Sequence, residues 1–172
     1  EQGLVTKAFM KVERFRLFLT ALHRSDDPAA VNEDFVSFLG SSSFLTPHAE
    51  EVCKLLSQNH QIYILTNALE AVHTNRIQQS LLAPYIQGNF ISESIGYEKP
   101  HKAYFDYVFS HIPGITKENC LLIGDSLTSD MQGGVNAGIP VCWYNPGQLA
   151  NNSVLSIDYE IRDLLELPAL VN

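Results

Sequence analysis

Short apolar segments alternate with helical patterns over most of this chain, and this alternation limits its fold more than any other feature. After residue 44, apolar runs of four or five residues stand at 61–65, 120–123 and 140–144. Between them, apolar residues recur at three- and four-residue steps, which is helical spacing. Strands that are apolar on both faces and alternate with helices are typical of a parallel sheet covered on both sides. The sequence therefore predicts an α/β protein built around a parallel sheet.

The first forty residues differ, because their apolar pattern is helical throughout. We expect helices over 4–22 and from 28 to 39, followed by a linker at 40–43. The tract at 40–43 separates a helical segment, residues 1–43, from the α/β unit, residues 44–172. In that unit the same patterns predict helices over 46–56, 70–80, 102–111 and from 129 onward, and weaker strands at 89–92 and 158–161.

The composition argues against two classes of partner. The 172 residues include 11 basic and 19 acidic side chains, which gives a net charge of −8 without any run of basic residues, so nucleic acid is not an expected partner. No apolar stretch approaches 18 residues, so no membrane span is expected either. Three scattered cysteines lie within apolar runs, which indicates core positions and a reducing, cytoplasmic location.

Polar side chains follow the predicted strands at the points where those strands end. Thr66 and Asn67 come after the strand at 61–65, while Asp125 and Asp130 come after the strand at 120–123. Lys99 stands between these two groups, just ahead of a helix. Because ligands of parallel sheets bind at the carboxyl ends of the strands, we expect these five side chains to meet at one edge.

The residue types at this edge suit a phosphate or metal site. The Thr66 hydroxyl and the N–H groups after it can hold a phosphate oxygen, although a strand-end threonine often serves only its own turn. Lys99 precedes Pro100, which keeps it out of the helix, and its ammonium can neutralise a phosphoryl group. Asp125 offers a hard oxygen ligand of the kind that Mg²⁺ prefers. Asp130 could orient a metal-bound water, hold Lys99 or cap the next helix, and Asn67 could support the site or the substrate.

At these residues the chain resembles the haloacid dehalogenase (HAD) superfamily of phosphotransferases, and in detail its pyrimidine 5′-nucleotidase branch. The superfamily resemblance rests on residues 64–67, 98–100 with Phe105, 123–130 and 133–138, and the branch resemblance on 92–96, 133–138 and Trp143. It implies a Rossmann-like parallel core with part of an α-helical cap. Residues 1–43 would be the remainder of the cap, and residues 44–172 the core without its first strand.

The resemblance also implies a chemistry. It indicates a Mg²⁺-dependent phosphomonoester hydrolase that works through an aspartyl-phosphate on a small phosphorylated metabolite, a nucleoside 5′-monophosphate. Thr66, Lys99 and Asp130 would then be catalytic. Thr66, Asn67 and Lys99 would bind the phosphate, and Asp125 would bind the metal.

One motif of that family has no counterpart here. The nucleophile of the family lies in an Asp-x-Asp motif after an apolar strand and ahead of the cap, whereas Asp26-Asp27 follows a helix and Asp158 comes after every other motif. We therefore expect the chain to begin inside the cap and the 172 residues alone to be inactive. Two alternatives stay open: a haloacid dehalogenase-type hydrolase, which needs no metal, and a non-catalytic HAD-like binding or regulatory module.

Overall fold

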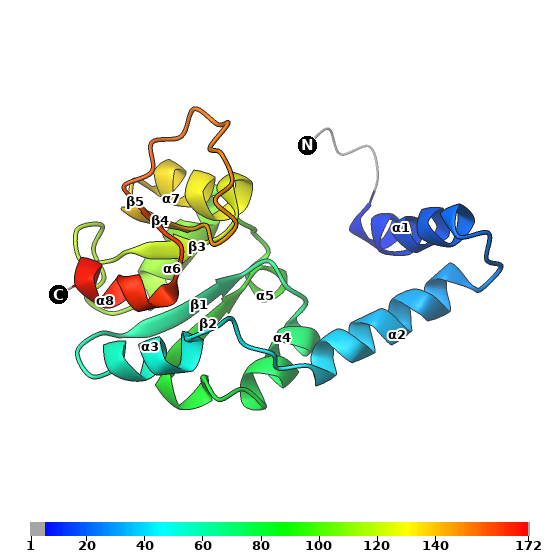
Figure 1. Cartoon of the computed structure of the whole chain (residues 1–172), viewed down its shortest axis with the longest axis horizontal. Helices are drawn as coiled ribbons and strands as arrows, with labels where there is room; N and C mark the ends of the chain where they lie inside the picture. Colours follow the sequence, from blue (N-terminus) through cyan, green and yellow to red (C-terminus); the bar gives the residue numbers. More distant parts are fainter. Residues whose placement is uncertain (1–5, 172) are drawn as a thin grey trace.

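The chain forms a two-helix hairpin that extends from an α/β body (Figure 1). A computed structural model describes residues 6–171. Helices α1 (Lys7–Ala21) and α2 (Pro28–Ser41) make the hairpin and confirm the helical start of the chain, with residues 4 and 5 of the first expected helix outside the described residues. The Asp27 side chain caps α2 by accepting a hydrogen bond from the N–H of Ala29 at 3.0 Å, and Pro28 occupies the first helical position.

The linker expected at 40–43 is shortened at its start, because its first two residues are helical and the irregular segment begins at Ser42. Helix α2 continues through Gly40 and Ser41 and packs against α4 (Glu70–Gln78). Arg76 of α4 donates from Nε to the carbonyl oxygen of Ser42 at 3.0 Å, just beyond the helix end. Packing against α4 offsets the roughly 1 kcal/mol that a helical glycine costs relative to alanine, which explains why the helix continues through Gly40 to Ser41.

Two parallel sheets form the body, instead of one continuous sheet. The first pairs β1 (Ile62–Thr66) with β2 (Ile86–Ile91), and the second holds β3 (Leu122–Gly124), β4 (Val141–Tyr144) and β5 (Tyr159–Ile161) in that order. The other elements are α3 (Ala49–Leu56), η1 (Ala83–Tyr85), α5 (Ser92–Ile95), α6 (Lys102–His111), the π-helical turn η2 (Leu127–Met131), α7 (Gln132–Ala137), η3 (Leu164–Glu166) and α8 (Leu167–Val171). Across residues 6–171, no helix combines the length and the apolar character that crossing a membrane requires.

Several boundaries differ from the sequence prediction for local reasons. The strand expected at 89–92 begins earlier, at Ile86. The sequence did not indicate its first three residues, because Gly88 weakens the strand pattern. In the structure the backbone of Gly88 lies against the ring of Tyr63. Helix α3 begins at Ala49 rather than at Thr46, since His48 adopts a left-handed conformation with φ 63°. The helix expected from residue 129 already begins at Leu127.

Helix α6 is the element that joins the two sheets. Its buried side chains Tyr104, Phe105 and Val108 belong to one hydrophobic cluster with Phe90 of β2 and with core residues of the second sheet, Leu122, Val141 and Trp143. Cys142 lies in a second cluster and is fully buried, as expected, while Cys53 and Cys120 are half-buried, and all three thiols are free.

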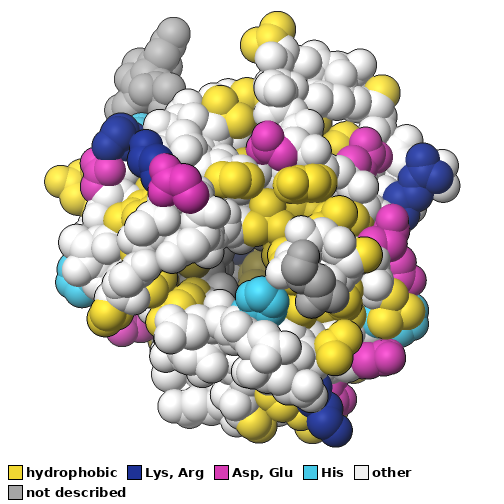
Figure 2. All heavy atoms as spheres, turned by 90° about the vertical axis from the view of Figure 1, so that its left-hand side faces the viewer, with side chains coloured by type: hydrophobic (Ala, Val, Ile, Leu, Met, Phe, Trp, Pro, Cys, Tyr) yellow, Lys and Arg dark blue, Asp and Glu magenta, His cyan; other side chains and the backbone are white. Residues whose placement is uncertain are grey.

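The edges of β1 and β3 are not paired with each other. All five side chains of β1 are only half-buried, and Ile123 of β3 is 38% exposed, although such apolar strands are normally buried on both faces. The face of the body opposite the hairpin is hollowed near its centre, with hydrophobic side chains above the hollow and a histidine at its lower edge (Figure 2). The expected absence of a core strand stays a prediction.

Two adjacent glycines set how closely α7 approaches its neighbours. A Cβ atom on Gly133 would lie 2.6 Å from Cε2 of Phe105, and one on Gly134 would overlap Cγ1 of Val141. Such atoms cannot be accommodated without moving a buried side chain or the helix. The glycine pair therefore brings α7, and with it the turn after β3, directly onto α6 and the second sheet.

We predict opposite effects on stability for alanine at two helical glycines. Gly134→Ala should lower the thermal unfolding midpoint, because over-packing costs about 1–3 kcal/mol. Gly40→Ala is the matched control, since the nearest atom to its Cβ would be 3.8 Å away and helix propensity favours alanine. Circular dichroism melts measure both, and a midpoint for Gly134→Ala at or above that of the wild type would contradict the packing argument.

Candidate active site

Lys99 links the carboxyl ends of the two sheets. Its Nζ donates hydrogen bonds to the carbonyl oxygen of Leu65 in β1 and to Oδ1 of Asp130 beyond β3, each at 2.6 Å. The side chains of Lys99 and Asp130 are each only 9% exposed. Two charges removed from water to this extent need good geometry and further hydrogen bonds, and both are present here.

Asp130 is held at both carboxylate oxygens. Its Oδ2 accepts a hydrogen bond from the N–H of Ser126 at 3.1 Å, while Oδ1 faces Lys99. A Cβ atom on Gly124 would lie 2.5 Å from Cγ of Asp130, so the carboxylate fits only over a glycine. The helix cap is Ser126, whose hydroxyl accepts from the N–H of Ser129 at 3.2 Å. Of the interpretations left open for Asp130, the geometry therefore matches the one in which it holds Lys99, while Ser126 provides the cap.

Thr66 lies at the end of β1 with its hydroxyl oriented by the turn. Its Oγ1 accepts a hydrogen bond from the N–H of Ala68 at 3.2 Å, so the threonine does serve its own turn. Within residues 6–171 the hydroxyl hydrogen has no acceptor, and it remains able to donate to a ligand oxygen.

Asn67 is bonded to the backbone of Lys99. Its Oδ1 accepts from the N–H of Lys99, and its Nδ2 donates to the carbonyl oxygen of Lys99, both at 2.9 Å. One N–H of the Asn67 amide and its oxygen therefore both bind the backbone of one residue, Lys99. This pairing of residues 32 positions apart has no signal in the sequence.

Tyr104 places a hydroxyl between the ends of β1 and β2. Its oxygen accepts from the N–H of Thr66 at 3.1 Å, and its hydrogen is donated to the carbonyl oxygen of Phe90 at 2.6 Å. Burial raises the pKa of Tyr104 well above its ordinary value, which the Thr66 N–H partly offsets and the charge of Asp130 reinforces. The group is thus a neutral phenol, as its donation to Phe90 requires. The sequence analysis did not single out Tyr104; the available signal was that a buried tyrosine hydroxyl needs a partner.

Asp125 stands outside this network. It follows Gly124 directly at the end of β3, and its carboxylate is exposed and has no hydrogen-bond or ion-pair partner in the described part of the chain. Trp143 of β4 fixes the backbone here by donating from Nε1 to the carbonyl oxygen of Asp125 at 3.0 Å. The donor is of the type that Mg²⁺ prefers. Among residues 6–171, however, no three His, Cys, Asp or Glu side chains gather as a metal site, so Asp125 could be only part of a metal's ligand set.

Lys102, three residues after Lys99, does not reach this edge. Its side chain is 60% exposed and pairs with Asp106 one turn along α6. Of these two lysines, only Lys99, the one expected at this edge, has its ammonium at the strand ends.

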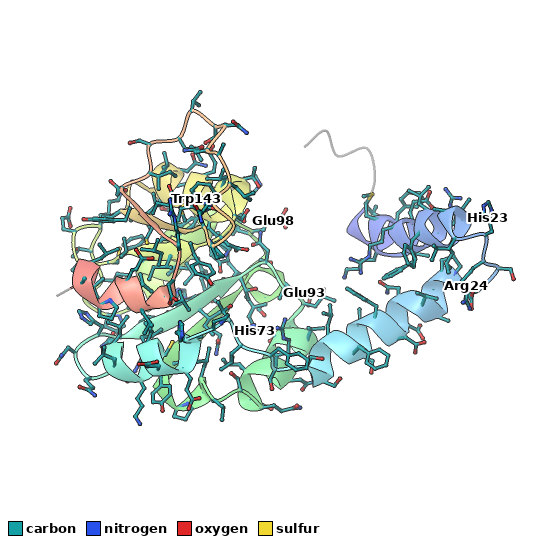
Figure 3. All side chains as sticks on the ribbon, in the orientation of Figure 1. His23, Arg24, His73, Glu93, Glu98 and Trp143 are labelled. Atoms are coloured by element: carbon teal, nitrogen blue, oxygen red, sulfur yellow. The ribbon has the colours of Figure 1, made fainter. Side chains whose placement is uncertain are left out.

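A cavity of about 480 Å³ opens along the loop that carries Lys99. It is lined by Ser92, Glu93, Gly96, Tyr97, Glu98 and His101. Glu93 and Glu98 lie on the side of the body that faces the hairpin (Figure 3). Oε2 of Glu93 accepts from the N–H of Glu70 at 2.8 Å, which anchors the start of α4 beside the cavity.

Residues 5–138 match the sequence profile of haloacid dehalogenase-like hydrolases. The chain belongs to this family. Over its whole length it is 36% identical to the HAD-hydrolase YfnB of Bacillus subtilis and covers 73% of that protein. The crystal structure of magnesium-bound YfnB matches 99% of the chain with a TM-score of 0.94, and 75% of the YfnB chain is covered.

Two further relatives in this family are pyrimidine 5′-nucleotidases. PynA of Streptococcus pneumoniae is 42% identical over 115 residues, which are 65% of this chain and 48% of PynA. YjjG of Escherichia coli is 28% identical over 171 residues, which are 99% of this chain and 75% of YjjG. The chain therefore spans about half of PynA and three quarters of YfnB and YjjG. The expected relation to the nucleotidase branch of the HAD family is confirmed.

We predict that the two lysines differ sharply in their contribution to stability. Lys99→Ala should destabilise the fold by about 3–5 kcal/mol, because it leaves the carboxylate of Asp130 buried without its partner. Lys102→Ala should change stability by less than about 0.5 kcal/mol, as expected for an exposed pair. Urea unfolding followed by circular dichroism measures both values, and equal effects of the two substitutions would argue against a buried pair at Lys99.

Proposed function

We propose that the intact protein is a Mg²⁺-dependent phosphomonoester hydrolase that acts on nucleoside 5′-monophosphates. The observation that carries this proposal is the buried ammonium of Lys99, held by Asp130 at strand ends that also carry the hydroxyl of Thr66 and the exposed carboxylate of Asp125. Two relationships support the proposal. PynA and YjjG are pyrimidine 5′-nucleotidases, and YfnB binds magnesium in its crystal structure.

In this proposal, Thr66 and Lys99 bind the phosphate. The N–H of Ala68 orients Oγ1 of Thr66, so that the hydroxyl hydrogen can be donated to a phosphate oxygen. An ammonium group has three hydrogens, and Leu65 and Asp130 take two of those on Lys99. The third is left for a phosphoryl oxygen, whose charge the ammonium neutralises as the bond to the leaving group breaks.

Asp125 would hold the metal in this scheme. Mg²⁺ takes one or two protein carboxylates and keeps several water molecules, so a single exposed carboxylate fits it as part of a larger ligand set. When bound, the ion neutralises charge on the phosphoryl group. Trp143 contributes by fixing the backbone of Asp125.

The covalent step requires a carboxylate nucleophile that attacks phosphorus while the alcohol leaves, after which water releases the phosphate. No aspartate within residues 1–172 follows a strand ahead of the helical hairpin. We propose that this carboxylate lies outside the 172 residues, which by themselves bind phosphate without hydrolysing it. The exposed Asp125 favours the phosphatase over a dehalogenase, because the latter needs no metal ligand.

The cavity along the Lys99 loop would take the nucleoside. The ring of Tyr97 is 54% exposed and offers a flat apolar face on which a base can stack. Glu93 and His101 add polar groups for the sugar hydroxyls. A cavity of about 480 Å³ is large enough for a small ligand.

The substitution Asp125→Asn tests the proposed metal role. In the intact protein it should lower the turnover of cytidine and uridine 5′-monophosphate by about 100- to 1,000-fold and abolish the response to Mg²⁺. Asp106→Asn is the matched control, because this exposed carboxylate pairs with Lys102 on the surface of α6, and it should keep wild-type rates.

Steady-state assays across a Mg²⁺ titration give both results. Wild-type turnover and Mg²⁺ response in Asp125→Asn would show that Asp125 is not the ligand. An intact protein that binds inorganic phosphate and hydrolyses no ester would favour the non-catalytic binding module.

A further inference from the structure

Two asparagines from distant parts of the chain hold consecutive residues of the Lys99–Pro100 loop. Asn67, after β1, bonds to both the N–H and the carbonyl oxygen of Lys99. Asn136, on α7, donates from Nδ2 to the carbonyl oxygen of Pro100 at 3.0 Å. The loop is therefore fixed from the side of the first sheet and from the side of the second.

Each of these amides is itself held in place. Oδ1 of Asn136 accepts from Nε2 of Gln132 at 2.8 Å, one helical turn earlier, which fixes the orientation of the amide. Helix α7 is fixed in turn by the close approach at Gly133 and Gly134. Asn67 follows Thr66 directly, and the backbone of Thr66 is tied to the hydroxyl of Tyr104.

The loop segment determines where the ammonium of Lys99 lies. Nζ must reach the carbonyl of Leu65 and the carboxylate of Asp130 at the same time, both at 2.6 Å. A shift of the Lys99 backbone by about 1 Å would break one of these hydrogen bonds, since donor–acceptor distances beyond about 3.5 Å no longer count as bonds. The lysine side chain cannot fix the position of its own ammonium, because it rotates about four bonds and is flexible.

We propose that Asn67 and Asn136 are positioning residues that set the Lys99 ammonium in the site, and that neither binds the phosphate. The assignment of a catalytic purpose to this positioning rests on the proposed function. Asn67 was expected among the phosphate-binding residues, but one donor and one acceptor of its amide are already committed to Lys99.

The substitution Asn67→Asp gives a sharp test, because it keeps the shape of the side chain and changes one atom. Where Nδ2 donates to the carbonyl oxygen of Lys99, the aspartate would set an oxygen against an oxygen. The pair of hydrogen bonds from Asn67 to the backbone of Lys99, which we call the amide clamp, should lose its bond to the carbonyl oxygen. The Lys99 side chain should then become more accessible to solvent. Asn59→Asp is the matched control. It makes the same change of charge at an exposed residue ahead of β1, whereas Asn67 and the Lys99 loop lie at the other end of that strand.

Accessibility is measured by brief acetylation of lysines in the intact protein, followed by mass spectrometry of each site. Lys102, whose side chain is 60% exposed, serves as the internal standard for Lys99, whose side chain is 9% exposed. Alkylation of the buried thiol of Cys142 reports any global unfolding. We expect Lys99 to react slowly in the wild type and in Asn59→Asp, and about tenfold faster in Asn67→Asp, without change at Lys102 or Cys142. Asn136→Ala, which removes the hydrogen bond to the carbonyl oxygen of Pro100 together with the one from Gln132 on an exposed helix face, should give a smaller increase in the same direction.

Kinetics with p-nitrophenyl phosphate separates positioning from ligand binding. A positioning role lowers kcat of Asn67→Asp and leaves KM within about twofold, whereas a phosphate ligand raises KM. Wild-type labelling of Lys99 in both variants, or a raised KM with unchanged labelling, would overturn the proposal. Because labelling needs no turnover, a protein that hydrolyses nothing would refute the proposed function while the labelling result still decides the role of the asparagines.

Discussion

The ion pair between Lys99 and Asp130 is the interaction on which the arrangement of this edge depends. Both side chains are almost fully buried, so each charge would be strongly unfavourable without the other. The pair joins the end of β1, through the Leu65 carbonyl, to the turn after β3. It is the point where the two sheets of the body are tied together at the side on which a ligand would bind.

The close packing of the body serves the same arrangement. Gly124 leaves room for Asp130, and Gly133 with Gly134 lets α7 rest on α6 and β4. Helix α6 fills the space between the sheets with large buried side chains, and its Tyr104 hydroxyl reaches the strand ends. The glycines of the family motif thus act through the steric room that they leave, and the side chains that they admit carry the chemistry.

Much of this site can be predicted from the sequence, because apolar runs mark where the strands end and the residues that follow them are known. Thr66, Lys99 and Asp130 were expected at one edge of a parallel sheet, and the structure brings Lys99 and Asp130 into contact and sets Thr66 next to Leu65 at the end of β1. The amide clamp of Asn67 and the hydroxyl bridge of Tyr104 were not predicted, because each depends on which backbone groups of distant segments meet. The helical course of Gly40 and the early start of β2 were missed for the related reason that tertiary contacts outweighed local propensity.

The central claim is that Lys99 and Asp130 stabilise one another across the two sheets, and a double-mutant cycle measures this directly. Lys99→Met, Asp130→Asn and the double variant are unfolded with urea, and their free energies of unfolding are compared with that of the wild type. The structure predicts that each single substitution is strongly destabilising and that the double variant loses less than their sum, with a coupling free energy of about 2–3 kcal/mol. Additive effects, with no coupling between the two positions, would contradict the account.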